Sequence, residues 1–380
     1  MHGPCTTQPR VLIADDQADL LDALRLLLKG EGMQMEAVTS PDAALAELAA
    51  RPYDLLLMDL NYTGDTTSGT EGMDLLSRVQ AFDASLPVVV MTGWGSVDLA
   101  VESMRRGVRD FVQKPWDNAH LLATLRSEIA AGRERRQQAD DGRREMEEAR
   151  RIQRKLLPAT LPNVEGCEIA SQWRPASGVG GDCFDLIPFG PARLGVCIAD
   201  VVGKGIPAAL LMSNLQAAVR AFATEAAQPS ELCQQVNRIL CGNIAEGRFI
   251  SFFYGRLDTC LGLFTYANAG HYLPVVVHEN GSIDRLSHGG PVLGVFSDAV
   301  YEQGQVPVVS GDRLVLFTDG VTEARNAADE EFGEERLLAS IIEHRACSAP
   351  ALEARLSAAV AAFANDTFLD DATLIVVALE

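Results

Sequence analysis

Four stretches decide the fold of the first third of the chain: VLIADDQ at residues 11–17, DLLLMDL at 54–60, PVVVMTGWGS at 87–96 and DFVQKPW at 110–116. Each contains an apolar run that is typical of a buried strand, and stretches with helical periodicity lie between them. We expect strands at 11–14, 35–38, 54–58, 88–91 and 111–113, and helices at 20–29, 41–50, 72–82 and 97–106, with a fifth helix after Pro115. This alternation predicts an α/β domain over 9–125 with a five-stranded, doubly wound parallel sheet.

Polar side chains stand where these predicted strands end. They are Asp15 and Asp16 after the first strand, Asp59 after the third, Thr92 after the fourth and Lys114 after the fifth. A single Asp at such a place is often only a helix cap. In a parallel sheet, however, all these ends lie at one edge, where such folds place their sites. Converging carboxylates repel one another unless a hard cation joins them, so the pattern predicts a Mg²⁺ site with a hydroxyl and an ammonium beside it.

The four stretches resemble those of the response-regulator receiver family, over essentially all of residues 9–125. The resemblance implies that Asp59 accepts a phosphoryl group from a cognate sensor histidine kinase. It implies the following site: Mg²⁺ ligands Asp15, Asp16, Asp59 and the backbone carbonyl of Asn61, phosphoryl contacts Thr92 and Lys114, and the switch aromatic Phe111. The chain departs from the family in the loop NYTGDTTSGTEG at 61–72, which is longer and more polar than usual.

Residues 126–158 have a different composition and predict a helical linker. Over 132–155 there are nine basic and six acidic residues, a local net charge of +3 within an acidic chain. Met146, Ala149, Gln153 and Leu156 have the a and d spacing of a short, imperfect heptad seam. Two interpretations stay open: a solvated linker helix, or a coiled-coil signalling helix that forms a homodimer.

Residues 159–380 return to a mixed composition with many strands and few helices. We expect strands at 195–199, 252–257, 263–267, 273–277, 313–317 and 374–377, and helices at 206–225, 230–246, 334–344 and 350–364. This balance predicts an α+β domain, a β-sandwich flanked by helices, and not a second βαβ alternation.

A second set of acids lies beside glycines or at strand ends of this last zone: Asp182 and Asp185 in GVGGDCFD, Asp200, Asp319, and the pair Asp370–Asp371. Taken singly, each has an ordinary explanation, such as a hairpin turn at Asp319–Gly320. Together, without His or Cys at ligand spacing, they favour hard divalent cations over zinc. Two such cations can activate water for attack on phosphorus. We find no cysteine-phosphatase loop, GxSxG elbow, Walker loop or kinase string.

This zone looks like the metal-dependent, PPM-type (SpoIIE-like) serine/threonine phosphatases, in the branch that regulates sporulation and stress sigma factors. The strings that carry the resemblance are ARRIQRKLLPATLP, RPASGVGGDCFD, ADVVGKGIPAALLM, SFFYGRLD, YANAGHYLPVVV, LGVF, LVLFTDGVTEARN and DDATLIVV, which span 149–380. The resemblance implies two Mn²⁺ or Mg²⁺ ions held by Asp182, Asp200, the Val201 carbonyl, Asp319 and Asp370, with Asp371 as the alternative to Asp370.

Three residues of this zone have open roles. Lys204 stands where many relatives carry His, and no general acid is secure. Arg174 and Lys204 are candidates for phosphate contact by position and charge. His271, in NAGH, is either catalytic or a structural hydrogen-bonding residue.

Composition limits the classes of function. The 380 residues suggest two domains or three small ones, and 32 basic against 52 acidic residues give a net charge of −20. This charge argues against nonspecific binding of nucleic acid. No apolar run reaches the length of a membrane span and residues 1–10 lack a signal core, so we expect a cytoplasmic protein. The eight cysteines form no CxxC pair and are expected to be reduced thiols.

The sequence therefore predicts a two-component response regulator in which phosphorylation of Asp59 controls a phosphoprotein phosphatase. The resemblance alone suggests the substrate, an anti-sigma factor antagonist of a partner-switching pathway. One alternative is a nonenzymatic adaptor that uses a degenerate phosphatase fold to bind partners. A DNA-binding response regulator is a weaker alternative, because the C-terminal part is acidic and rich in β-strands.

Overall fold

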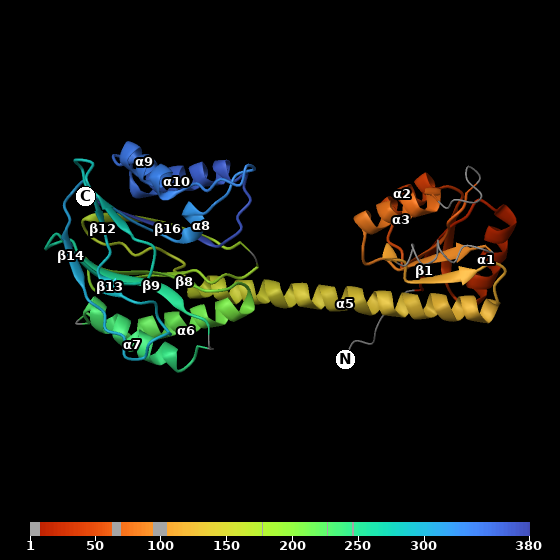
Figure 1. Cartoon of the computed structure of the whole chain (residues 1–380), viewed down its shortest axis with the longest axis horizontal. Helices are drawn as coiled ribbons and strands as arrows, with labels where there is room; N and C mark the ends of the chain where they lie inside the picture. Colours follow the sequence, from red (N-terminus) through yellow and green to blue (C-terminus); the bar gives the residue numbers. More distant parts are fainter. Residues whose placement is uncertain (1–7, 63–69, 94–104, 177, 226, 245–246) are drawn as a thin grey trace. The chain divides into compact units, whose positions relative to one another are not determined.

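The computed structural model describes residues 8–62, 70–93, 105–176, 178–225, 227–244 and 247–380. The chain divides into two compact units, Met1–Arg144 and Glu145–Glu380 (Figure 1). Most of the helix expected at 97–106 and most of the polar loop at 61–72 lie outside the described residues.

The first unit contains the predicted five-stranded parallel sheet. Its strands are β1 (Arg10–Ala14), β2 (Gln34–Val38), β3 (Leu55–Asp59), β4 (Val88–Thr92) and β5 (Asp110–Gln113), in the order β2-β1-β3-β4-β5. β3 lies one residue later than expected, so Asp59 is its last residue, as Thr92 is of β4. The doubly wound fold is confirmed, and the polar residues lie at the carboxyl edge of the sheet.

Helices cover both faces of this sheet (Figure 1). The helices are α1 (Ala18–Gly30), α2 (Pro41–Ala50), α3 (Thr70–Phe82) and α5 (Asn118–Leu156). Because successive side chains of a strand point to opposite faces, Leu12 packs with α2 and α3, whereas Ile13 packs with α1 and α5. The sheet is therefore buried on both sides, as its continuous apolar strands require.

The fifth helix of the receiver and the predicted linker helix are one continuous element, α5, of 39 residues. Besides packing on the sheet, α5 forms ion pairs and hydrogen bonds with residues near the N-terminal ends of the strands. Arg133 donates to both carboxylate oxygens of Asp54 at 2.8 and 2.9 Å, and Asp54 also accepts the backbone N–H of Arg10. Arg136 donates to the Tyr53 carbonyl and to Asp83 and Ser85.

The second unit is a sandwich of two sheets. The first sheet consists of six strands: β7 (Cys183–Pro188), β8 (Arg193–Val201), β9 (Ile250–Asp258), β10 (Leu263–Ala269), β13 (Gly289–Gly290) and β14 (Gly304–Pro307). The second sheet consists of five strands: β6 (Cys167–Arg174), β11 (Val275–Val277), β12 (Ile283–Arg285), β15 (Arg313–Phe317) and β16 (Ala372–Leu379). β16 lies between β15 and β6 and is paired over its whole length with β6. One core of buried side chains combines residues of both sheets.

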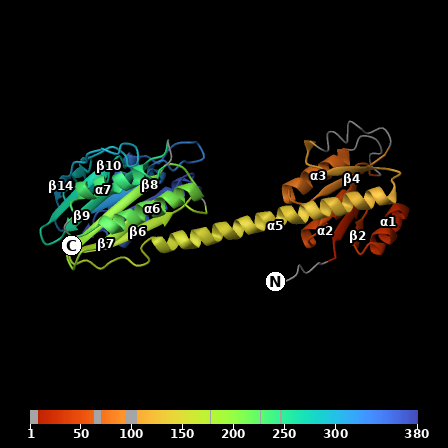
Figure 2. The same ribbon diagram turned by 90° about the horizontal axis from the view of Figure 1, so that it is seen from below.

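Two pairs of helices cover the outer faces of the sandwich. α6 (Ile206–Phe222) and α7 (Pro229–Cys241) lie over the first sheet (Figure 2). α9 (Glu334–His344) and α10 (Ala349–Phe363) cover the second. The predicted sandwich flanked by helices is confirmed. The hairpin-turn explanation of Asp319–Gly320 is wrong, because Asp319 opens a short helix, α8 (Asp319–Thr322).

Two expectations from composition can be compared with the described residues. Within them, no helix combines the length and apolar character that crossing a membrane requires. The seven cysteines among them are all free thiols.

Two glycines of α5 predict opposite effects of added side chains. A Cβ at Gly132 would lie 2.4 Å from Cγ of Pro87, whereas a Cβ at Gly142 would meet nothing within 4 Å. Gly142→Ala is expected to stabilise the helix by about 1 kcal/mol, the difference in helix propensity. Gly132→Ala is expected to be less stable than Gly142→Ala by about 1–3 kcal/mol, the cost of overpacking. Hydrogen exchange of β1 and β3 amides in the full chain measures the Gly132 effect, and equal stability of both variants would contradict the close packing.

Candidate functional site

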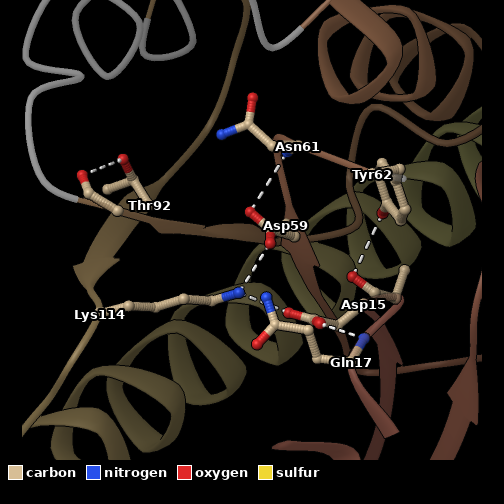
Figure 3. Close-up of polar contacts among 9 residues, drawn as sticks. Asp15, Gln17, Asp59, Asn61, Tyr62, Thr92 and Lys114 are labelled. Atoms are coloured by element: carbon tan, nitrogen blue, oxygen red, sulfur yellow. Dashed lines mark hydrogen bonds and ion pairs between the residues drawn. The ribbon is translucent and has the colours of Figure 1, made fainter. Parts of the chain in front are cut away.

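Three acids converge at the carboxyl edge of the sheet of the first unit, and Figure 3 shows two of them, Asp15 and Asp59. One carboxylate oxygen from each of Asp15, Asp16 and Asp59 lies within 4.8 Å of the others. Asp15 and Asp59 are buried and Asp16 is half-buried. An all-oxygen ligand set of this size fits Mg²⁺. Asp16 comes directly after the buried Asp15, so a single turn after β1 supplies two of the three acids.

Lys114 bridges two of these acids. Its Nζ lies 2.6 Å from Oδ2 of Asp15 and 2.7 Å from Oδ2 of Asp59. Burial would lower the pKa of Lys114, but its hydrogen bonds to the two carboxylates raise it above the usual value. Burial raises the pKa of Asp15, in opposition to the hydrogen bond from Lys114. The ammonium thus neutralises part of the charge that the acids place in a buried site.

The remaining predicted receiver residues surround this cluster. The backbone N–H of Asn61 donates to Oδ1 of Asp59 at 3.3 Å, and Thr92 lies at the end of the neighbouring strand (Figure 3). Phe111, on the edge strand β5, has 41% of its surface exposed. Tyr62 was not predicted: its buried hydroxyl donates to the carbonyl of Ala14 at 3.2 Å and so joins the turns after β3 and β1. The sequence signal that could have indicated Tyr62 is its place directly after the predicted ligand Asn61.

In the second unit, Asp182 is the most firmly held acid. Its side chain is buried, and Oδ2 accepts hydrogen bonds from Thr318 at 2.7 Å and Thr373 at 2.6 Å. Oδ1 is also buried and has no hydrogen-bond partner among the described residues. Burial and the charge of Asp200 raise the pKa of Asp182 well above its usual value. A buried carboxylate oxygen without a donor fits a site that a cation completes. Thr318 directly precedes Asp319 in the string TDG, and Thr373 follows Asp371 by two residues in the string DDAT. These positions could have indicated the two threonines in the sequence.

Asp200 and Asp319 belong to the same electrostatic cluster. Burial, followed by the charges of Asp319 and Asp370, raises the pKa of Asp200 to about 7. Burial and Asp370 raise the pKa of Asp319 to about 6. The acids come from the end of β8, the start of α8 and the segment before β16, so the fold brings distant stretches together. The raised pKa values show that the charges of these acids act on one another in a partly buried cluster.

The two adjacent acids Asp370 and Asp371 differ in their surroundings. Asp371 is buried and accepts backbone N–H groups of Ala176 at 2.8 Å, Gly181 at 2.6 Å and Asp182 at 3.5 Å. Its oxygens are thus engaged in fixing the loop that leads to Asp182. The side chain of Asp370 is 45% exposed and contacts Nζ of Lys204 at 3.0 Å. Asp370 therefore has the less engaged carboxylate of the two, and its role as a ligand stays a prediction.

Gly181 explains how the loop approaches the predicted carbonyl ligand. A Cβ at Gly181 would lie 2.8 Å from the carbonyl oxygen of Val201. Any side chain there would therefore separate the loop from the end of β8. Val201 as a whole residue is buried, so its carbonyl faces this loop and not solvent.

The structure separates three other candidate residues from the acid cluster. Asp185 is buried but forms a two-pronged ion pair with Arg220 of α6, at 2.6 and 3.1 Å. His271 is buried, its Nδ1 lies 2.9 Å from Oγ of Ser251, and burial lowers its pKa to about 4, which favours a neutral structural residue. Arg174 contacts Asp366 and the ring of Phe368.

Comparisons with known proteins agree with both units. The model of the family described as "Stage II sporulation protein E (SpoIIE)" matches residues 190–380, half of the chain, and "Response regulator receiver domain" matches 11–126. The phosphoserine phosphatase RsbU of Bacillus subtilis is 34% identical over 54% of this chain and 60% of its own length. Protein IcfG of Synechocystis sp. is 28% identical over 63% of this chain and 43% of its own length.

The chain thus spans about half the length of these curated relatives. Among solved structures, the SiaA-PP2C domain of Pseudomonas aeruginosa matches 64% of this chain and 98% of its own length, with a TM-score of 0.56 at 21% identity. That likeness concerns the fold. The chain belongs to the SpoIIE family, and it joins a PP2C-type domain of that family to an N-terminal response-regulator receiver domain.

Proposed function

We propose that the chain is a metal-dependent protein serine/threonine phosphatase whose activity is controlled by phosphorylation of Asp59. The observation that carries the enzymatic part is the cluster of Asp182, Asp200, Asp319 and Asp370. These acids come from separate elements, burial and the charges of Asp319 and Asp370 raise the pKa of Asp200, and a buried oxygen of Asp182 has no hydrogen-bond partner among the described residues. The names of the phosphoserine phosphatase relatives support the same activity.

The residues would have different roles in such a centre. Asp182, Asp200, the carbonyl of Val201, Asp319 and Asp370 would hold two Mn²⁺ or Mg²⁺ ions. When bound, such ions supply Lewis acidity and lower the pKa of water for attack on phosphorus. Thr318 and Thr373 orient Asp182, and Asp371 fixes the loop before it. Lys204 is a candidate for phosphate contact, because its ammonium lies at the exposed side of Asp370.

In the receiver, Asp15, Asp16, Asp59 and the carbonyl of Asn61 would hold Mg²⁺, whose charge favours the approach of a phosphoryl group to Asp59. Thr92 and Lys114 would contact that group, and Phe111 would move as Thr92 is drawn toward it. The phosphoryl donor would be a sensor histidine kinase. The substrate of the phosphatase would be a phosphorylated antagonist of an anti-sigma factor, which rests on the family resemblance.

Control of the phosphatase would pass through α5, which is anchored in each unit. In the receiver, Arg133 and Arg136 hold it to the base of the strands. In the second unit, Gln153 is buried and pairs with the peptide of Gly180: its Nε2 donates to the carbonyl at 2.6 Å, and its Oε1 accepts the N–H at 3.0 Å. Gly180 lies two residues before Asp182. A shift of α5 would therefore act directly on the loop that carries a metal ligand.

The proposed homodimer through α5 needs a different face from the predicted seam. Met146 packs against Gly178, Gln153 bonds Gly180, and Leu156 packs against the core of the second unit. Ile152, beside the seam, is 55% exposed and is available to a second copy. Dimerisation through the linker stays a prediction.

The activity itself is the first test. We expect Mn²⁺-dependent release of phosphate from a phosphoserine protein, abolished by chelator. Asp200→Asn and Asp319→Asn should each reduce turnover by more than the roughly 10–100-fold that is typical of losing an outer-shell partner. Asp298→Asn, at an exposed acid outside the cluster, is the matched control and should retain full turnover. Folded protein without turnover on several phosphoproteins would favour the adaptor.

Metal binding should also depend on pH. Asp200 and Asp319, with pKa values raised to about 7 and about 6, hold protons that a cation must displace. We expect Mn²⁺ binding to weaken as the pH falls from 8 to 6. Without metal, the raised pKa values make the folded state bind more protons than the unfolded state. The stability of the folded state should therefore increase as the pH falls from 8 to 6, and decrease as the pH rises through 7. Thermal unfolding at pH 6 and pH 8, with chelator and with Mn²⁺, measures both effects. A protein that is more stable at pH 8 than at pH 6 in chelator would contradict the raised pKa values.

Receiver control can be separated from catalysis. Beryllofluoride on Asp59 should change the rate of phosphate release in the wild type. Arg133→Ala/Arg136→Ala should lose most of this response and keep the basal turnover, because α5 would no longer follow the receiver. Arg143→Ala/Arg144→Ala, on the exposed part of the same helix, should respond as the wild type does. An intact response in the first variant would exclude this anchoring as the route of control.

A further inference from the structure

Asp370 has few contacts that fix its own side chain. Asp182 is held by two threonine hydroxyls in the core, whereas Asp370 is half-exposed. Among the described residues, its carboxylate contacts Nζ of Lys204 at 3.0 Å and accepts the backbone N–H of Asp371 at 2.9 Å. The position of Asp370 therefore depends mainly on the backbone that carries it.

That backbone is held after Asp370 by Asp371, and directly before Asp370 the Nζ of Lys204 donates to the carbonyl of Leu369. Earlier in the chain, α10 ends at Phe363, and Asn365 and Asp366 have φ values of 49° and 58°. Two successive left-handed residues that are not glycine need support from their surroundings. The segment 365–369 therefore requires an anchor before it reaches Asp370.

Arg174, the last residue of β6, provides this anchor. Its Nη2 donates to the carbonyl of Asp366 at 3.1 Å, and its guanidinium lies 4.2 Å from the ring centre of Phe368. Nη1 lies 3.5 Å from the Asp366 carboxylate, a weaker contact at the surface. Phe368 in turn packs against the core under α10. β6 is paired with β16 up to Arg174 and Ala372, so the anchor lies at the end of a continuous pair of hydrogen-bonded strands.

We propose that Arg174 is a positioning residue that holds the segment 365–369 and thereby sets the affinity of the phosphatase centre for the cation bound by Asp370. Its guanidinium is engaged with this segment, whereas a phosphate contact, the role considered from the sequence, would need it free. This inference rests on the proposed metal-dependent phosphatase.

The test compares Mn²⁺ binding, measured from the electron paramagnetic resonance of free Mn²⁺, in five proteins of 380 residues: wild type, Arg174→Gln, Arg174→Lys, Phe368→Ala and Arg336→Gln. Arg336 is a matched control, because its guanidinium lies over the Phe363 ring and donates to the carbonyls of Glu331 and Phe332. The receiver site contributes equally to every measurement, since all substitutions lie in the other unit. Circular dichroism verifies the fold of each variant.

We expect Arg174→Gln and Phe368→Ala to weaken Mn²⁺ binding to the phosphatase unit about 10-fold or more, the effect typical of a residue that orients a ligand. Arg336→Gln should bind as the wild type does. Arg174→Lys should not restore binding, because an ammonium lacks the planar group that both stacks and donates. At saturating Mn²⁺, kcat/KM of Arg174→Gln should return to within a few-fold of the wild type.

Wild-type Mn²⁺ binding in Arg174→Gln would overturn the proposal, and a raised KM for phosphoprotein at saturating Mn²⁺ would then identify a phosphate contact. Equal weakening in Arg336→Gln would also overturn it, because the effect would then reflect general stability. The binding measurement does not use turnover. Absence of metal-dependent turnover in the wild type would contradict the proposed function and would leave the role of Arg174 to be decided by the binding data alone.

Discussion

Repulsion among carboxylates that the fold forces together is the constraint on which both units depend. In the receiver, Lys114 supplies a positive charge between Asp15 and Asp59. In the phosphatase unit, Lys204 contacts Asp370 and the carbonyl of Leu369, and burial together with neighbouring acids raises the pKa values of Asp200 and Asp319. Raised pKa values mean that the folded state disfavours the charged carboxylates. A bound cation would relieve this cost, as we propose for the phosphatase centre.

The sequence predicted the parts of this arrangement that depend on local pattern. Apolar runs located the strands, and because parallel strands end at one edge, the position of the receiver acids followed from strand order. Asp185 could not be distinguished from Asp182 in this way. Both lie in one string, yet only the fold places Arg220 of α6 beside Asp185 and two threonines beside Asp182. Contacts between distant segments are not encoded in spacing.

The linker illustrates the same limit. Its heptad spacing leaves open a solvated helix and a seam for a second copy, and periodicity is equally consistent with packing on the same chain. Gln153 resolves the question locally, because its amide places an N–H donor and a carbonyl acceptor side by side, where they pair with the carbonyl and the N–H of Gly180. Buried against Gly180, it would leave two polar groups unsatisfied if α5 moved away. The end of α5 is thus part of the second unit's core and not a free connector.

The loop from Ala176 to Asp182 is the element on which these contacts converge. Gln153 holds it at Gly180, Asp371 holds it at Gly181, and Asp182 then enters the core. The glycines permit this approach, since a Cβ at Gly180 would lie 2.3 Å from the Asp371 carboxylate. A displacement at the α5 side would therefore reach both Asp182 and Asp371 within two peptide units. Coupling needs an element with two discrete arrangements, and in our proposal this loop, held by hydrogen bonds to Gln153 and Asp371, is that element.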